Sequence, residues 1–237
     1  MTGCWARSLG FFALAVLVAG LCVPAAAGAD YAVKKFIVNA GDGRNPFSEN
    51  AYVLSDPATG DAVLIDPGAA DPRIAAYVAQ KKLVVRKILY THAHDDHIGG
   101  GRHFADLYKA KIAGPRGDAG LFSPTENRPE EWLDGDSMAV FGSLSVRVIS
   151  TPGHTPGGVC FLAGDNLISG DTLFKGSIGK PYGNSEGERS TRQAELVAGI
   201  RRKLLSLPVT TWVYPGHGPS TTIMDEAADN PFLKPKK

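Results

Sequence analysis

The sequence predicts an α/β or α+β fold, because strand-like segments alternate with helix-like segments and several neighbouring strands are joined as hairpins. Turn residues between apolar runs mark three hairpins, at residues 51–65, 138–149 and 161–168. Helix-like periodicity occurs at residues 71–81, 102–110 and 190–205. At 237 residues, the chain is long enough for one sizeable core and too short for two large domains.

Residues 1–29 are expected to form a secretory signal peptide rather than part of that core. Arg7 precedes an uncharged apolar run at residues 9–23, and the small residues before Asp30 suit a cleavage site. An uncleaved anchor helix is the alternative, but this run has only 15 residues, whereas a bilayer span needs about 20. We therefore expect a secreted or periplasmic protein whose single domain covers residues 30–237 and has no stable membrane association.

The first half of this domain is predicted to form strands and a helix that lead to a histidine-rich run. Residues 32–38, 51–54 and 62–65 are apolar strand candidates, and Asp66 follows the third. Asp66 either orients a ligand histidine or only forms a turn. Asp71 and Pro72 suit the N-cap and first residue of a helix that reaches about residue 81. Residues 84–90 form the next strand.

The second half is predicted to contain a short strand at residues 111–114, two hairpins, an amphipathic helix, a last strand at 211–214 and a closing helix at 221–228. Cys160 lies in an apolar segment, so we expect a small buried hydrophobe rather than a zinc ligand. Cys4 and Cys22 leave with the signal peptide, so no disulfide can form within the mature chain.

The run from His92 to His97 holds three histidines and two aspartates within six residues. Neutral imidazoles and carboxylates are ligands that zinc, iron and manganese accept. Side chains two apart in an extended segment point the same way, so His92 and His94 can reach one metal together. Asp96 and His97 follow as the chain turns and can reach a second ion.

Three further ligand candidates lie in Gly/Pro-containing loops after apolar segments: His154, Asp171 and His217. Together with the run, they give five histidines and two aspartates, enough for two metals with a shared bridging carboxylate. We expect two divalent ions, with zinc favoured over iron and manganese.

The motifs T-H-x-H-x-D-H, T-P-G-H-T-P-G, G-D-T-L-F and P-G-H-G occur in this order. With them the chain resembles the metallo-β-lactamase superfamily and, more closely, its glyoxalase II-like thioesterases, over about residues 36–233. The resemblance implies a four-layer αββα sandwich with the metals at one edge of the two sheets. It also implies the ligand sets: His92, His94 and His154 for the first metal; Asp96, His97 and His217 for the second; and Asp171 as the bridge.

The resemblance also bears on three glycines that follow the histidine-rich run, Gly99 to Gly101. No Lys-Ser/Thr pair comes after them, so they do not form a phosphate-binding P-loop. By the resemblance they begin a helix and let the backbone pass close to the metals. His103, on the predicted helix, is expected to be structural.

This ligand set suits metal-assisted hydrolysis. Two cations lower the pKa of a shared water, so that hydroxide attacks a carbonyl while the metals stabilise the oxyanion. Asp96 and Asp171 are therefore assigned as catalytic as well as metal-binding residues. In the resembled superfamily, true metallo-β-lactamases have Cys or Ser at the place of Asp171. The carboxylate thus favours a thioesterase, lactonase or phosphodiesterase.

The G-K-P-Y run at residues 179–182 resembles the G-K-F-Y run of glyoxalase II. The resemblance implies that Lys180 meets a substrate carboxylate and that Tyr182 meets a peptide backbone. The alternative is a surface lysine and a packing tyrosine. Only 20 residues follow His217, so the resemblance is to single-domain glyoxalase II-like proteins, without the helical domain that completes the glutathione site.

The leading hypothesis is an exported binuclear metallohydrolase that cleaves a small-molecule thioester or ester. Alternatives within the fold are a mononuclear-iron persulfide dioxygenase, a β-lactamase and a lactonase. A non-enzymatic role for the metals is a further alternative, although structural zinc sites lack open coordination positions. Residues 30–237 carry 24 basic and 24 acidic side chains, so no basic excess favours nucleic acid as a partner. The sequence indicates no oligomeric state.

Overall fold

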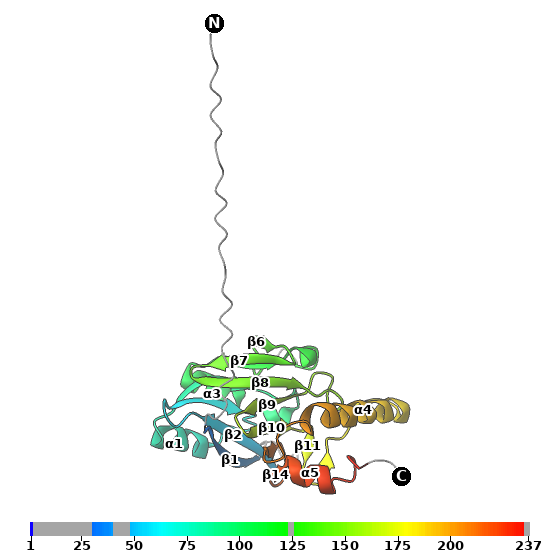
Figure 1. The fold of residues 1–237 in the computed structure, drawn as a ribbon. Coiled ribbons are helices and arrows are strands. Elements are labelled where there is room, and N and C mark those ends of the chain that lie inside the picture. The colour runs from blue at the N-terminus through cyan, green and yellow to red at the C-terminus, as the bar shows by residue number, and fades with distance from the viewer. Residues whose placement is uncertain (2–29, 40–47, 123–125, 235–237) are drawn as a thin grey trace.

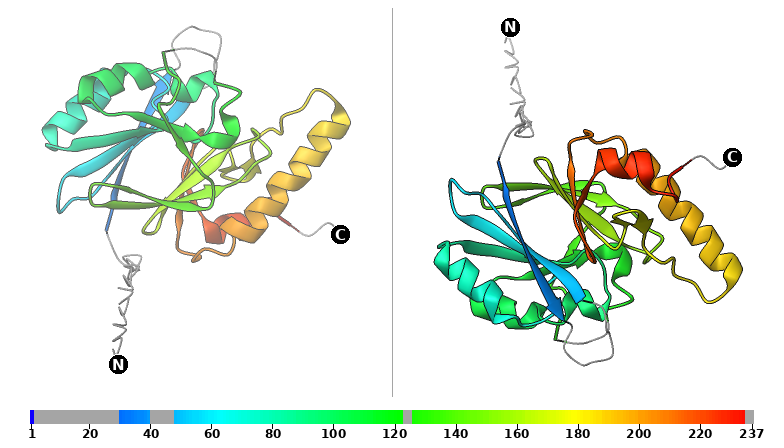
Figure 2. Two further views of the ribbon diagram at one scale, coloured as in Figure 1. Left: turned by 90° about the horizontal axis from the view of Figure 1, so that it is seen from above. Right: turned by 90° about the horizontal axis from the view of Figure 1, so that it is seen from below.

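The structure, a computed structural model, describes residues 1, 30–39, 48–122 and 126–234. Two six-stranded sheets pack face to face, and helices cover both outer faces (Figures 1 and 2). This arrangement confirms the predicted four-layer αββα sandwich. The expected signal peptide falls almost entirely outside the described residues. Among those residues, none of the helices combines the length and the apolar character needed to cross a membrane.

The first sheet combines an antiparallel half with a parallel half. Strands β1 to β3 pair antiparallel, which confirms the hairpin predicted at residues 51–65, and β3 to β6 pair parallel. Helix α1 connects β3 to β4, and helix α3 connects β4 to β5, as parallel neighbours require. In chain order the elements are β1 (Ala32–Asn39), β2 (Ser48–Ser55), β3 (Asp61–Ile65), α1 (Pro72–Gln80), β4 (Val84–Leu89), α2 (Asp95–Ile98), α3 (Gly101–Tyr108), β5 (Ile112–Pro115), the 3-10 turn η1 (Arg116–Asp118) and β6 (Glu131–Leu133).

The second sheet has the strand order β14-β13-β10-β9-β8-β7. Strands β7, β8, β9 and β10 form successive antiparallel pairs, which confirms the other two predicted hairpins, and β13 joins β10 in parallel. The elements are β7 (Ser137–Phe141), β8 (Leu144–Ser150), β9 (Val159–Ala163), β10 (Asn166–Gly170), the small pair β11 (Leu173–Phe174) and β12 (Ser177–Ile178), α4 (Glu186–Gly199), the π-helical turn η2 (Ile200–Leu204), β13 (Trp212–Pro215), β14 (Thr221–Thr222) and α5 (Ile223–Asp229).

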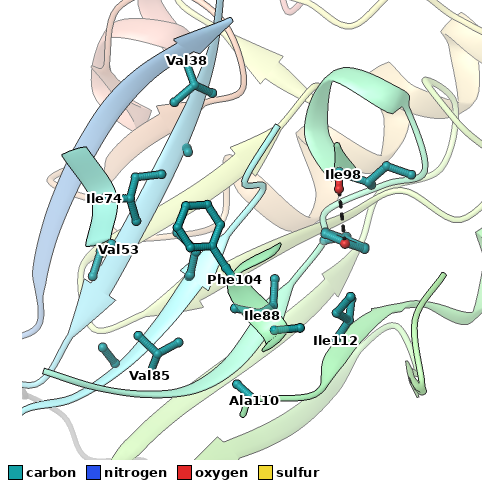
Figure 3. Close-up of a cluster of buried hydrophobic side chains, with 14 of the residues drawn as sticks. Val38, Val53, Ile74, Val85, Ile88, Ile98, Phe104, Ala110 and Ile112 are labelled. Carbon is teal, nitrogen blue, oxygen red and sulfur yellow. Dashed lines mark hydrogen bonds between the residues drawn. The ribbon is translucent and has the colours of Figure 1, made fainter. Parts of the chain in front are cut away.

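Three clusters of buried apolar side chains fill the three interfaces between the four layers. Figure 3 shows the first, where Ile74 of α1 and Phe104 of α3 pack on Val53 and Ile88 of the first sheet. The second lies between the sheets, and the third joins the second sheet to α4, η2 and α5. Each fully buried aliphatic or aromatic side chain contributes about 1.5–3 kcal/mol. The layers therefore form one continuous scaffold for the loops at their edge.

Two predicted helix boundaries are wrong. The helix predicted at 190–205 begins at Glu186, because the Ser185 side chain caps it by accepting from the Glu188 N–H at 3.2 Å. Its last turn is π-helical, at Ile200–Leu204. The helix predicted at 221–228 begins only at Ile223, since Thr221–Thr222 pairs with β13 as a strand and Thr222 serves as the N-cap.

Gly99 to Gly101 do begin a helix, but their close contacts differ from those expected. A Cβ atom at Gly99 would lie 2.5 Å from the Gly68 carbonyl oxygen, and one at Gly100 would lie 2.4 Å from the Ala69 backbone carbon. A Cβ atom at Gly101 would overlap the Tyr90 hydroxyl. Gly99 and Gly100 therefore let the α2–α3 segment pack on the loop after β3, and Gly101 makes room for Tyr90. The atoms that these glycines approach most closely do not belong to the predicted metal ligands.

Cys160 is a small buried residue in the third cluster, as predicted, with no exposed surface. Burial raises the pKa of its thiol to about 11. The thiol also belongs to none of the described groups of side chains that could hold a metal. Its role is therefore packing.

Candidate metal centre

The seven predicted ligands meet at one edge of the sandwich. The loop after β4 contributes two of them and helix α2, which follows it, contributes two more, while the loops after β8, β10 and β13 contribute one each. Parallel strands end at the same edge of a sheet, so the loops after β10 and β13 lie side by side. The packing of the two sheets brings them to the loop after β4, where the Val159 N–H donates to the Thr91 carbonyl at 3.0 Å.

The first group of converging side chains is His92, His94, His154 and Asp171, whose possible ligand atoms all lie within 4.8 Å of one another. His94 Nδ1 lies 3.0 Å from His92 Nε2 and 3.1 Å from His154 Nε2. His154 Nε2 lies 3.3 Å from Asp171 Oδ2. Three imidazole nitrogens and a carboxylate oxygen thus face one point, which is the donor set of a divalent transition metal.

The second group is Asp96, His97 and His217. His217 Nε2 lies 3.4 Å from Asp96 Oδ2. Asp171 reaches this group too, since its Oδ1 lies 3.4 Å from His97 Nε2 and its Oδ2 lies 3.6 Å from His217 Nε2. The carboxylate of Asp171 therefore stands between the two groups, where the resemblance expects a bridging ligand.

The chemistry of these side chains fits a pair of divalent cations. His97 Nε2 and Asp171 Oδ1 are buried and have no hydrogen-bond partner, which is costly unless another species satisfies them. Burial lowers the pKa of His92, of His94 and of His154, so these imidazoles are neutral at pH 7 and offer lone pairs. Burial alone would raise the pKa of Asp171, but the neighbouring His97 outweighs it and the pKa is lowered.

In four of the ligand histidines, the ring nitrogen that faces away from the centre has an oxygen partner. This contact orients the other ring nitrogen toward the position of a metal. His154 Nδ1 donates to the Lys180 carbonyl at 2.8 Å, and His217 Nδ1 donates to the Ser48 carbonyl at 2.9 Å. His97 Nδ1 lies 3.0 Å from Asp66 Oδ2, and His92 Nδ1 lies 3.0 Å from Thr91 Oγ1.

Asp66 resolves an alternative that the sequence leaves open. It orients His97, and its carboxylate also accepts from the Thr91 N–H at 2.7 Å and the Thr91 hydroxyl at 2.6 Å. It sits in the left-handed region, with φ of 48°, where Asp is one of the better tolerated residues. Asp66 therefore both forms the turn and supports the site.

Sequence reasoning missed two supporting residues, Asn50 and Asp118. The Asn50 amide donates to the Pro215 and Gly218 carbonyls, each at 2.9 Å, and so holds the loop that carries His217. Asp118 accepts from the Gly157 N–H at 2.6 Å and the Ala93 N–H at 3.2 Å, which ties two ligand loops together. Asn50 could have been noticed as a polar residue directly before an apolar strand, but nothing in the local sequence marks Asp118.

Lys180 and Tyr182 lie beside the loop that carries His154. Lys180 is exposed, and the Tyr182 N–H donates to the Gly153 carbonyl at 3.1 Å. The Arg192 guanidinium of α4 lies 4.8 Å from the centroid of the half-buried Tyr182 ring. His103 lies apart, exposed on α3, with its ring 4.9 Å from that of Phe104.

Gly216 offers a steric test of the centre. An alanine Cβ at this position would overlap Asp171 Oδ1 and lie 2.6 Å from His97 Cε1. We expect Gly216→Ala to displace both side chains and to lower metal content by at least about tenfold, measured by elemental analysis after gel filtration. Gly199→Ala is the control, because a Cβ there meets nothing within 4 Å. Full metal content in the Gly216 variant would contradict the geometry described above.

Comparisons with known proteins agree with this geometry. Residues 44–217 match the metallo-beta-lactamase superfamily. The chain is 34% identical over 208 residues to the probable metallo-hydrolase YqgX of Bacillus subtilis, covering 79% of this chain and 93% of YqgX. It is 29% identical over 211 residues to hydroxyacylglutathione hydrolase GloC of Haemophilus influenzae, covering 80% of this chain and 95% of GloC.

A solved structure is also similar to this chain. The crystal structure of BLEG-1 B3 metallo-beta-lactamase has a TM-score of 0.72 and 30% sequence identity to this chain. The match covers 86% of this chain and 100% of that one. On its motifs, fold and site geometry, and on these comparisons, the chain belongs to the metallo-beta-lactamase superfamily.

Proposed function

We propose that the protein is a binuclear metallohydrolase that cleaves a thioester, of the hydroxyacylglutathione hydrolase type. The observation that carries the proposal is the position of Asp171, 3.3 Å from His154 in the first group and 3.4 Å from His97 in the second. A carboxylate shared in this way suits two ions held close together, and paired ions are a recurring arrangement in hydrolytic enzymes.

Two bound divalent cations would supply hydroxide at neutral pH and stabilise the negative charge that develops on a carbonyl oxygen. His92, His94 and His154 would hold one ion, and Asp96, His97 and His217 the other. Burial by itself would raise the pKa of Asp96, but the neighbouring His217 and His97 rings lower it. Asp96 and Asp171 therefore remain ionised at neutral pH and balance part of the charge of the cations.

Lys180 and Tyr182 support a thioester with an anionic thiol part. Both lie next to His154, because the Lys180 carbonyl accepts from His154 Nδ1 and the Tyr182 N–H donates to Gly153. An exposed ammonium group beside the ligand loop suits a substrate carboxylate. The similarity to hydroxyacylglutathione hydrolase GloC, which extends over 80% of this chain, supports the same substrate class.

Hydrolysis of S-lactoylglutathione by zinc-loaded protein comprising residues 30–237 tests the proposal, with metal-free protein as the control. We expect activity that depends on the metal. Inactivity of folded, metal-loaded protein would contradict the glutathione thioester. Parallel assays with nitrocefin, a simple lactone and glutathione persulfide with oxygen uptake would then separate a β-lactamase, a lactonase and a dioxygenase. A β-lactamase is the second candidate because of the likeness to BLEG-1.

Lys180→Ala should raise KM for S-lactoylglutathione by roughly tenfold and leave kcat nearly unchanged, because a carboxylate contact made equally in substrate and transition state affects binding alone. Steady-state kinetics measure both quantities. Lys175→Ala, which removes another exposed lysine, should change neither. An unchanged KM in the Lys180 variant would show that this lysine is only a surface residue.

We also propose that the protein is exported and loses residues 1–29. The apolar run at residues 9–23 and the small residues before Asp30 support this. N-terminal sequencing of protein recovered from the periplasm or the culture medium should begin at Asp30. Protein recovered only with the membrane, with Met1 retained, would instead indicate an uncleaved anchor.

A further inference from the structure

Glu49 of β2 is a buried acid beside His97, and burial raises its pKa while the nearby His97 acts to lower it. The Glu49 side chain has no exposed surface, and neither carboxylate oxygen has a hydrogen-bond partner in the part of the chain that the structure describes. Glu49 Oε1 lies 3.7 Å from His97 Nδ1, too far for a hydrogen bond. That nitrogen already donates to Asp66 at 3.0 Å. Two carboxylates therefore face the outer side of one imidazole, although one would suffice to orient it.

Such an arrangement is unfavourable unless a positive charge lies nearby, because a buried carboxylate without partners loses its hydration and gains nothing in return. Another buried glutamate in this chain has a full set of partners. Glu226 accepts from the Thr221 hydroxyl at 2.8 Å, the Asn230 amide at 2.8 Å and the Gly176 N–H at 3.0 Å. Glu49 thus differs from a residue that holds the fold together.

The surroundings of Glu49 also argue against a separate metal site made with its neighbours. Glu49, Asp66 and His97 lie close enough together to form a possible group. His97 Nδ1, however, gives its hydrogen to Asp66 and so has no lone pair for another ion. A Cβ at Gly68 would lie 3.0 Å from Glu49 Oε2, so the backbone packs closely on the carboxylate. A cation at the inner nitrogen of His97 would place a positive charge near Glu49 without entering the outer side of the ring.

We propose that Glu49 is a positioning residue that acts through His97 and strengthens binding of the ion held by Asp96, His97 and His217. The inference rests on the two-ion centre of the proposed function. Glu49 and Asp66 together place two carboxyl groups behind His97, and a cation at the inner nitrogen of that ring would favour their ionised forms, because charges in a buried site are screened far less than in water. None of the histidines of the first group has two carboxylates behind it within the described residues. Removal of Glu49 should therefore affect mainly one ion.

The test compares Glu49→Gln with wild-type protein, each loaded with zinc and then titrated with a chromophoric chelator. The amide keeps the size of the side chain and removes its charge. We expect wild-type protein to release two ions and Glu49→Gln to bind one of them about 10–100-fold less tightly, the range found when groups behind a metal ligand are replaced. The other ion should change by less than about threefold. Glu226→Gln, at a buried glutamate remote from the ligands, should leave both affinities unchanged.

Unfolding of the metal-free proteins provides a readout that separates this role from a structural one. Glu49→Gln should be at least as stable as wild type, because it removes a buried charge without partners. Glu226→Gln should be less stable, because a neutral amide replaces a carboxylate that accepts three hydrogen bonds. Wild-type affinities in Glu49→Gln, or failure of that variant to fold, would overturn the inference. A wild-type protein that holds one ion would instead contradict the two-ion function. The effect of Glu49→Gln on that ion would then decide the inference separately.

Discussion

Replacement of Asp171 by alanine should lower kcat/KM for the hydrolysed substrate by about 1000-fold, because without the shared ligand the ions would no longer be held where they stabilise developing charge. Asp171 lies within 3.6 Å of ligand nitrogens in both groups. Steady-state kinetics on zinc-loaded protein measure the loss, and elemental analysis shows whether an ion leaves with the carboxylate.

Asp165→Ala is the matched control for this experiment. Asp165 lies in the turn just before β10, and its exposed side chain is at the opposite end of that strand from Asp171. Its backbone carbonyl, which accepts from the Trp212 N–H at 2.9 Å, is unaffected by the substitution. We expect activity close to wild type. A variant of Asp171 with a similarly small loss would rule out a shared carboxylate as the basis of the reaction.

Asp66→Asn should lower the free energy of unfolding of the metal-free protein by about 3 kcal/mol, because at least one buried donor would lose its acceptor and face an amide N–H. The donors are His97 Nδ1 and the backbone and hydroxyl groups of Thr91. Asparagine tolerates the left-handed backbone at this position, so the loss would report on the hydrogen bonds alone. Urea unfolding followed by circular dichroism measures it.

Asp56→Asn gives the comparison on an exposed turn. Its carboxylate accepts from the Ser143 hydroxyl at 2.6 Å and the Ala58 N–H at 2.8 Å, but water can replace both donors. We expect a change of about 0.5 kcal/mol. An equal, small effect at Asp66 would mean that the buried network around His97 does not contribute to folding.

Sequence patterns predicted the strands and hairpins better than the helix ends. The apolar residues of β8, β9 and β10 lie between short turns, so local alternation and turn chemistry identify them. The start of α4 was missed because its first two turns are polar and mostly exposed, and apolar periodicity carries no signal there. The capping pair Ser185 and Glu188 was the available signal.

The residues of the candidate site also differ in how well the sequence predicts them. The ligands could be predicted because four of them fall within one short run and the others lie in distinctive glycine and proline loops. The groups that hold these loops could not, because their partners are distant in sequence. Asn50 contacts Pro215 across 165 positions, and Asp118 contacts Gly157 across 39. Glu49 was missed for a further reason, since the predicted strand began two residues after it.

The division of the ligands between the two sheets has a consequence for how the chain folds. Four donors follow a strand of the first sheet and three follow strands of the second, so neither half alone offers the full set. An ion that needs donors from both halves is bound only after the halves have docked. Binding then stabilises the docked state by mass action, in proportion to the logarithm of the free metal concentration. The supply of metal would therefore affect the thermodynamic stability of the assembled sandwich as well as its chemistry.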